Sequence, residues 1–336
     1  MLTWSIETIN LPLRYTWKIS RNASTTKTNL VVTASGMASV QGRGEAAPNI
    51  RYGETPEKLL GEFAAVKPKL PLSIVPPGEL AALLSQSSIS AALRFAIESA
   101  FIHYISASQG IAVYQMMEIE RPPAVRTAYT IPIMEQGLMK KFYEEEGLDR
   151  FQFIKLKVER HTALEAVSEL ATFCRKPLMI DANESFTDPG ACLVWMEQIR
   201  QYNIAFIEQP MPASMVEESV YLKSRSPLPL MADESVTDKP DMRQIGGAFH
   251  GINMKLMKAG GYLNGIRILR EARKLGMKTM VGCMVETSLG ISSAMNLCSL
   301  TDYADLDSFM ILENEPFGLV KEEAGTLLRA AFLSES

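Results

Sequence analysis

The segment FQFIKLKV, residues 151–158, places Lys155 and Lys157 in an otherwise apolar run with the composition of a β-strand. Successive side chains of a strand point to opposite faces, so residues two apart share a face and both ammonium groups lie on one side. The next three apolar runs each lead into a carboxylate, in LMIDAN (178–183), IAFIEQP (204–210) and LPLMADES (228–235). Four consecutive strands that each carry charge indicate a shared site at one edge of a sheet.

After about residue 120, short β-rich runs alternate with stretches long enough for a helix, at a spacing of roughly 25 residues. The eight strand candidates are 127–133, 151–158, 178–181, 204–208, 228–233, 251–256, 278–281 and 303–306. This alternation predicts an α/β fold, a (β/α)7β TIM-like barrel. The rival is a doubly wound sheet, which usually has a glycine-rich phosphate turn after its first strand, and residues 127–136 contain no glycine.

The N-terminal part has a different pattern. Strands are predicted at 4–9 and 29–33 and helices at 79–84 and 90–106, which is typical of an α+β module. Residues 14–28 and 48–54 show neither period and are predicted to be loops, the first of them mobile. The predicted domains are an α+β capping domain over 1–118, a barrel catalytic domain over 119–312, and a segment 313–336 that packs back on the capping domain.

The composition is that of an ordinary folded protein, with 47% hydrophobic and 21% charged residues. A formal net charge of −4 without any Lys/Arg block argues against a nucleic-acid partner. The chain shows no signal-peptide pattern, and no apolar run approaches about 18 residues, so we expect a cytoplasmic protein without a membrane segment. The four cysteines lack Cys-x-x-Cys spacing, which favours free thiols over disulfides or a zinc site.

Barrel enzymes place their active sites at the carboxyl ends of the strands, so Asp181, Glu208 and Asp233 should converge there. Three carboxylates packed together repel one another and would take up protons unless a cation lies among them. Ligands that are all oxygen favour Mg²⁺, with Mn²⁺ as a substitute. Asn183, two residues beyond Asp181, is expected to orient a ligand from outside the metal's own shell.

A further lysine, Lys255, lies in the sixth strand, which is opposite the second strand in an eight-stranded barrel. Lys157 and Lys255 therefore face each other across the opening. One base on each side can remove a proton beside a carboxylate and return it from the other face, while a divalent metal stabilises the developing charge. Lys155 joins this catalytic group because its charge, with that of the metal, would lower the lysine pKa from about 10.4 to roughly 7–8.

In order along the chain, the motifs K-x-K, D-A-N, E-Q-P, D-E-S and N-x-K-x-x-K-x-G-G resemble those of the enolase superfamily, in its muconate lactonizing enzyme subgroup. The resemblance spans essentially the whole barrel, and the N-terminal module resembles that family's capping domain. It implies that Lys157 and Lys255 are the two bases. It also implies that Asp181, Glu208 and Asp233 are the Mg²⁺ ligands.

Residues at the rim indicate the substrate. Asp305 and Asp307, in the eighth strand, resemble the Asp-x-Asp pair with which dipeptide epimerases receive the N-terminal ammonium of their substrate. Arg21, in the first polar loop, resembles the arginine that meets the glutamate side chain in Ala-Glu epimerases. Further candidates for lining the substrate are Thr130 on the first barrel strand, and Met284 and Glu286 in the family-like segment 282–290.

The resemblance implies a small dipeptide substrate, with L-Ala-D/L-Glu first among the candidates and recycling of peptidoglycan peptides as the role. Symmetric homo-oligomers are common in the family. The same scaffold also serves o-succinylbenzoate synthases, N-acylamino acid racemases and cycloisomerases, whose substrates lack the free ammonium that an Asp-x-Asp pair would bind. A pyridoxal-phosphate barrel racemase would use Lys157 or Lys255 as a Schiff base. A barrel that only binds a ligand has no evident use for two opposed lysines.

Overall fold

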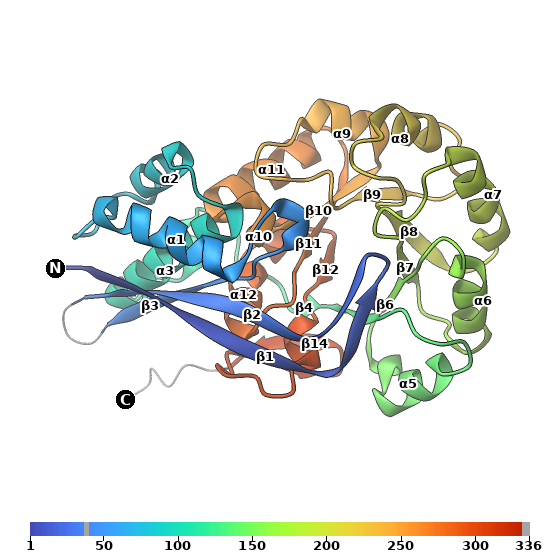
Figure 1. Ribbon diagram of the computed structural model, residues 1–336, viewed down its shortest axis with the longest axis horizontal. Helices are drawn as coiled ribbons and strands as arrows, with labels where there is room; N and C mark the ends of the chain where they lie inside the picture. The colour runs from blue at the N-terminus through green and yellow to red at the C-terminus, as the bar shows by residue number, and fades with distance from the viewer. Residues whose placement is uncertain (37–39, 331–336) are drawn as a thin grey trace.

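The computed structural model describes residues 1–36 and 40–330. Figure 1 shows parallel strands surrounded by helices, beside a smaller antiparallel sheet with helices of its own. Eight parallel strands form one sheet in the order β12-β11-β10-β9-β8-β7-β6-β5, and the antiparallel sheet has the order β1-β2-β3. The predicted fold class, a barrel with an α+β N-terminal module, is confirmed.

The N-terminal module consists of β1 (Thr3–Ile19), β2 (Asn22–Ser35), β3 (Gln41–Ala46), η2 (Ile50–Tyr52), α1 (Pro56–Val66), η3 (Lys67–Lys69), α2 (Pro77–Gln86), α3 (Ala91–Gln109) and α4 (Val113–Met116). Helix α3 lies directly on β3, which requires small residues at the contact. At Gly42 and Gly44 a Cβ atom would lie 2.1 Å from the backbone oxygens of Ala100 and Ala96. Glycine at these two positions therefore allows the helix and the strand to approach closely.

All eight strand candidates form strands of the barrel. They are β5 (Ala128–Ile131), β6 (Phe153–Lys157), β7 (Leu178–Asp181), β8 (Ile204–Glu208), β9 (Leu230–Ala232), β10 (Gly251–Lys255), β11 (Lys278–Gly282) and β12 (Tyr303–Asp305). Each strand pairs in parallel with the next along the chain. The ring closes between β12 and β5 through side chains, since the Leu306 N–H donates to Thr127 Oγ1 (2.8 Å) and the Thr130 N–H to Asp307 Oδ2 (2.6 Å).

Helical segments fill every connection of the barrel. They are α5 (Met139–Glu145), η4 (Leu148–Arg150), α6 (Ala163–Phe173), α7 (Pro189–Ile199), α8 (Val216–Lys223), α9 (Met242–Ala248), α10 (Leu256–Ala259), α11 (Tyr262–Lys274), α12 (Ser288–Met295), η5 (Cys298–Leu300) and, after the last strand, η6 (Ser308–Ile311). Seven strands are thus followed by helices before the next strand, as the (β/α)7β prediction requires. Across residues 1–36 and 40–330, no helix combines the length and the apolar character needed to cross a bilayer.

The interior of the barrel is divided into an apolar layer and a charged layer. A separate apolar cluster consists of Ala128, Met179, Phe206, Met231 and Met280, with Phe153 and Tyr303 packed against it. Two residues further along the same strand faces stand Thr130, Lys155, Asp181, Glu208, Asp233, Gly282 and Asp305. Side chains two residues apart on each strand therefore fill the barrel with an apolar layer and place the charged layer above it, at the carboxyl ends of the strands.

The prediction of a mobile loop at 14–28 is wrong, because β1 and β2 continue through it as a long antiparallel hairpin. Trp17 pairs with Ser24 and Ile19 with Asn22, which leaves Ser20 and Arg21 at the turn. The sequence 14–19, RYTWKI, does alternate polar and apolar side chains, but its partner segment 22–28, NASTTKT, is polar except for Ala23. Strands are predicted from the alternation of apolar and polar residues that arises when one face is buried. This hairpin is largely solvated, so its second strand does not show that alternation. In Figure 1 this hairpin extends from the N-terminal module toward the barrel strands.

The C-terminal hairpin of β13 (Val320–Glu323) and β14 (Thr326–Arg329) pairs with β4 (Val125–Arg126), next to the first barrel strand. Just before it, the Glu313 N–H donates to the Pro12 carbonyl of β1 (2.9 Å). The segment thus contacts both parts of the molecule, and its assignment to the capping domain, like the boundaries at 118 and 312, stays a prediction. Residues 331–336 of that segment lie outside the described residues.

Glu45 joins the N-terminal sheet to the barrel. Its buried carboxylate accepts hydrogen bonds from Asn29 Nδ2 (2.7 Å), from the backbone N–H and Oγ1 of Thr287 (3.1 and 2.7 Å), and from the Gly290 N–H (3.0 Å). Thr287 is the N-cap of α12 and Gly290 lies in its first turn, where free backbone N–H groups favour an anion. One carboxylate on β3 therefore satisfies four donors, three of which come from Thr287 and Gly290 across the boundary between the two parts.

We predict that Glu45→Ala lowers the free energy of unfolding by about 3 kcal/mol, because buried donors lose their acceptor. Urea unfolding followed by circular dichroism measures the change. Glu7→Ala, at an exposed position of β1, is the control and should alter stability by less than about 0.5 kcal/mol. Equal effects of the two substitutions would contradict the role given to Glu45.

Candidate active site

Lys155 is the centre of the charged layer. Its Nζ lies 2.8 Å from Asp305 Oδ2, 2.9 Å from Glu208 Oε2 and 3.0 Å from Asp181 Oδ2, and its side chain is 2% exposed. Burial alone would lower the pKa of Lys155, but the surrounding carboxylates, Asp305 and Glu208 foremost, hold that pKa well above its ordinary value. Lys155 is therefore a fixed cation that links β6 to β7, β8 and β12.

Lys157 and Lys255 occupy opposite sides of the barrel, since three strands separate β6 from β10 in either direction around the ring. Lys157 Nζ lies 2.5 Å from Asp181 Oδ2, and Lys255 Nζ lies 2.9 Å from Asp233 Oδ2. The opposed arrangement expected from the sequence is thus present in the strand order. Burial would lower the pKa of Lys255, but Asp233 outweighs burial and raises it above its ordinary value.

Asp181, Glu208 and Asp233 converge between these lysines, with one ligand atom from each within 4.8 Å of the others, and all three are buried. Burial and the neighbouring Asp181 raise the pKa of Glu208 to about 8. Among the described residues, Glu208 Oε2 receives no hydrogen bond of good geometry, although Lys155 is near. A buried triad whose ligand atoms are all carboxylate oxygens fits a divalent cation such as Mg²⁺.

Two further side chains complete this centre. Lys258, on α10, places Nζ 2.5 Å from Asp233 Oδ1 and also donates to the Asp233 carbonyl. Asn253, on β10, donates from Nδ2 to Glu208 Oε1 (2.8 Å). Both belong to the N-x-K-x-x-K motif, in which Lys255 alone was predicted to have a catalytic role. The signal was the spacing, because Asn253 shares a strand face with Lys255 and Lys258 follows one helical turn later.

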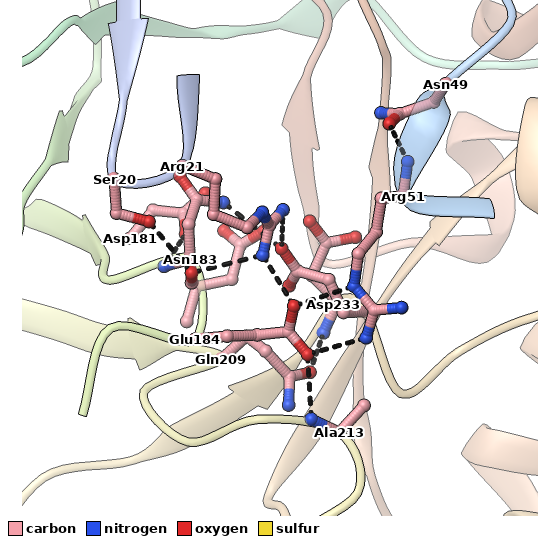
Figure 2. A network of polar contacts seen from close by, with 12 residues as sticks. Ser20, Arg21, Asn49, Arg51, Asp181, Asn183, Glu184, Gln209, Ala213 and Asp233 are labelled. Carbon is pink, nitrogen blue, oxygen red and sulfur yellow. Dashed lines mark hydrogen bonds and ion pairs between the residues drawn. The ribbon is translucent and has the colours of Figure 1, made fainter. Parts of the chain in front are cut away.

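Asn183 and Arg21 lie at the rim above the carboxylates. The Asn183 N–H donates to Asp181 Oδ1 (3.0 Å), so its contact with this carboxylate is made by the backbone. Arg21 reaches the rim from the hairpin turn, with Nη1 2.5 Å from Glu184 Oε2 (Figure 2). Its Nη2 lies 2.7 Å from Glu234 Oε1. The pairing of Arg21 with these two acids was not predicted from the sequence, since a charged residue after a strand gives no signal of which partner it will meet.

Asp305, Asp307 and Thr130 meet where the barrel closes. Asp305 is engaged by Lys155, and Thr130 Oγ1 lies 3.4 Å from Asp305 Oδ1. Asp307 accepts the Thr130 N–H, and burial together with Asp305 raises the pKa of Asp307 to about 7. The two carboxylates are thus close to each other and to the lysine–carboxylate centre. They form an acidic corner at the β5–β12 closure.

Met284 and Glu286 lie on the loop between β11 and α12. Met284 is partly buried, and its N–H donates to Glu286 Oε1 (2.8 Å). Burial and the nearby Glu45 raise the pKa of Glu286 to about 8. Glu286 therefore braces its own loop, and its contact with a substrate stays a prediction.

Comparison with known proteins places this arrangement in a family. Residues 136–321 match the model of the family described as enolase C-terminal domain-like. The chain is 34% identical over 331 residues to the L-Ala-D/L-amino acid epimerase of Pedosphaera parvula, covering 95% of this chain and 93% of that protein. It is 30% identical over 312 residues to the L-Ala-D/L-Glu epimerase of Bacteroides thetaiotaomicron, covering 91% of this chain and 80% of that protein.

Among solved structures, the dipeptide epimerase from Enterococcus faecalis V583, complexed with Mg and the dipeptide L-Leu-L-Tyr, is similar with a TM-score of 0.88 and 27% identity. The similarity covers 97% of this chain and 96% of that one. The order of motifs, the barrel and the extent of these matches agree with one another. The chain belongs to the enolase C-terminal domain-like family.

Proposed function

We propose that this protein is a dipeptide epimerase that inverts the α-carbon of the C-terminal residue, with L-Ala-D/L-Glu as the leading substrate. The observation that carries the proposal is the position of Lys157 and Lys255 on opposed strands, with a buried carboxylate triad between them. The names of the relatives, which are epimerases of Ala-containing dipeptides, support the substrate class. A role in recycling peptidoglycan peptides belongs to this proposal.

The chain's own residues divide the work of the reaction. The acidic corner of Asp305 and Asp307 would hold the dipeptide's ammonium, which sets the distance of the α-carbon from the rim. Lys157 would take the α-proton on one face while Lys255 supplies a proton to the other, and the roles reverse for the opposite epimer. Lys155, which stays charged among its carboxylates, adds positive potential near the substrate's carboxylate.

Asp181, Glu208 and Asp233 would hold Mg²⁺, with Mn²⁺ as a substitute. Bound there, the metal would supply positive charge that stabilises the electrons left on the substrate when the proton departs. Lys157 and Lys255, which pair with two of these carboxylates in the present structure, would then have weaker anionic partners.

Two rival functions are less well supported. N-acylamino acid racemases, o-succinylbenzoate synthases and cycloisomerases act on substrates without a free ammonium, for which the buried acidic corner offers no benefit. A pyridoxal-phosphate racemase would need a phosphate site near its Schiff-base lysine, whereas Lys157 and Lys255 are surrounded by carboxylates. Membership of the enolase-like family also favours metal-assisted proton transfer over either a Schiff-base enzyme or a binding protein.

Mg²⁺ at about 100 times its dissociation constant should stabilise the folded protein by about 2.7 kcal/mol, because only the folded chain assembles the triad. Thermal unfolding with Mg²⁺ and with a chelator measures this increment. Asp233→Asn should lose most of it, whereas Glu197→Gln, on the exposed face of α7, should keep it in full. The metal assignment fails if the wild-type protein shows no increment or Asp233→Asn retains it.

Lys157→Ala and Lys255→Ala should each lower kcat for epimerisation by on the order of 10³-fold, the effect of removing a general acid–base group. Each variant should still exchange the α-hydrogen of one epimer with deuterated solvent, and the two variants should act on opposite epimers. Nuclear magnetic resonance of each pure epimer in D2O follows this exchange, with Lys140→Ala on the exposed face of α5 as the control. Near-normal epimerisation by both variants would rule out the two-base mechanism.

N-acetylation of the dipeptide should abolish turnover, because the ammonium that Asp305 and Asp307 attract is then absent. For the free dipeptide, KM should fall as pH rises through about 7, the pKa to which burial and Asp305 raise Asp307. Below that pH Asp307 is neutral and attracts the ammonium weakly, and above it Asp307 is charged. Kinetics of both substrates between about pH 6 and pH 7.5 test this, because above that range the dipeptide's own amino group, with a pKa of about 8, loses its charge. Unchanged rates with the acetylated dipeptide would overturn the assignment of the acidic corner.

A further inference from the structure

Glu184 follows the metal-binding strand β7 and has an unusual backbone. It lies three residues beyond Asp181, and both Asn183 (φ 42°) and Glu184 (φ 64°) occupy the left-handed region. Two consecutive residues with side chains in this region are unfavourable unless the surroundings hold them there. The Glu184 side chain is only 8% exposed, so it is held in the rim and does not extend into solvent.

The Glu184 carboxylate is bound from three separate segments (Figure 2). Arg51 donates from Nε to Oε2 and from Nη2 to Oε1, both at 2.9 Å. Arg21 Nη1 lies 2.5 Å from Oε2, and the Ala213 N–H donates to Oε1 at 2.8 Å. Paired hydrogen bonds from one guanidinium to both oxygens fix the carboxylate's orientation as well as its position.

The three segments are far apart in the sequence. Arg21 is at the turn between β1 and β2, Arg51 is in η2, and Ala213 follows β8. The turn is fastened a second time, because Ser20 Oγ and Arg21 Nη1 both donate to the Asn183 carbonyl (2.9 and 3.1 Å). Both segments of the N-terminal module that approach the rim are therefore attached to one barrel residue.

A charged Glu184 is required for this attachment. Burial alone would raise its pKa, but the hydrogen bonds from Arg51 and the Ala213 N–H outweigh burial and hold the pKa below its ordinary value. The Arg51 side chain is 38% exposed, and Arg21 also pairs with Glu234. Glu184 is the carboxylate that contacts both arginines and so connects the two segments.

We propose that Glu184 is a positioning residue that fastens the hairpin turn and η2 together over the lysine–carboxylate centre, and so sets the affinity for the substrate. The effect on affinity rests on the proposed dipeptide epimerase function, whereas the fastening itself does not. Since Glu184 pairs with arginines and not with the catalytic lysines, it governs how the site is covered and not how the proton moves.

Hydrogen–deuterium exchange of the protein without substrate tests the fastening. Glu184→Gln keeps the size of the side chain but loses the charge, and should speed amide exchange about tenfold in both 17–25 and 48–54, the effect of weakening one charged hydrogen-bonded pair. The matched control is Glu146→Gln. Glu146 also binds an arginine of β1 through both oxygens, Arg14 Nη1 at 3.0 Å and Nη2 at 2.8 Å, but away from the turn.

Glu146→Gln should leave exchange in 17–25 and 48–54 within about twofold of the wild-type rate. The double variant Arg51→Gln/Glu184→Gln should exchange no faster than Glu184→Gln alone, because one interaction cannot be lost twice. Unchanged exchange in Glu184→Gln, or acceleration in only one of the two segments, would overturn the proposal. A drop in melting temperature with faster exchange throughout the chain would overturn it as well, since that would show a general structural role.

Steady-state kinetics with L-Ala-L-Glu test the consequence for substrate. Glu184→Gln should raise KM about tenfold and change kcat by less than about twofold, because the covering segments affect binding and the lysines are untouched. A fall in kcat with unchanged KM would overturn the positioning role. If the wild-type protein epimerises no dipeptide, the proposed function fails, while the exchange experiment still decides whether Glu184 joins the two segments.

Discussion

The neutralisation of charge at the mouth of the barrel is the constraint on which the rest of the structure depends. Asp181, Glu208, Asp233 and Asp305 are buried together, and buried carboxylates are costly unless opposite charges and hydrogen bonds compensate them. Lysines provide that compensation, with Lys155 placed among three of the acids. The lysines that balance these carboxylates are also the groups proposed to move protons. A bound metal or substrate would therefore change the ion pairs of these lysines, because it would pair with some of the same carboxylates.

The barrel makes this charge concentration tolerable by separating it from the apolar interior. Met179 and Phe206 belong to the apolar layer, while Asp181 and Glu208, two residues later on the same strands, belong to the charged layer. The outward-facing residues of the same strands, such as Ile180, pack instead against the surrounding helices in the main core. The alternation of side chains along each strand therefore places residues in the apolar layer, the charged layer and the main core. This explains why these short strands tolerate a charged residue at their ends.

The N-terminal module matters to the site because it supplies charge that the barrel lacks at its rim. Arg21 and Arg51 of the module pair with Glu184 of the barrel, and Glu45 of the module accepts hydrogen bonds at the start of α12. In both places a carboxylate on one part satisfies donors on the other. The geometry of the rim is thus set jointly by the two parts, and the barrel alone would leave Glu184 buried without its guanidinium partners.

The fold class, all eight barrel strands and the convergence of Asp181, Glu208 and Asp233 could be predicted from the sequence, because hydrophobic period and strand-end charge are local signals. The hairpin at 14–28 was missed, since a solvated ribbon is held by backbone pairing that leaves little trace in side-chain pattern. The partners of Arg21 could not be predicted either. Which carboxylate an arginine meets depends on how segments more than 100 residues apart fold together, and Glu184 lies 163 positions from Arg21. Only the tertiary structure brings such charges within a few ångströms, where Coulomb attraction and desolvation select the pairs.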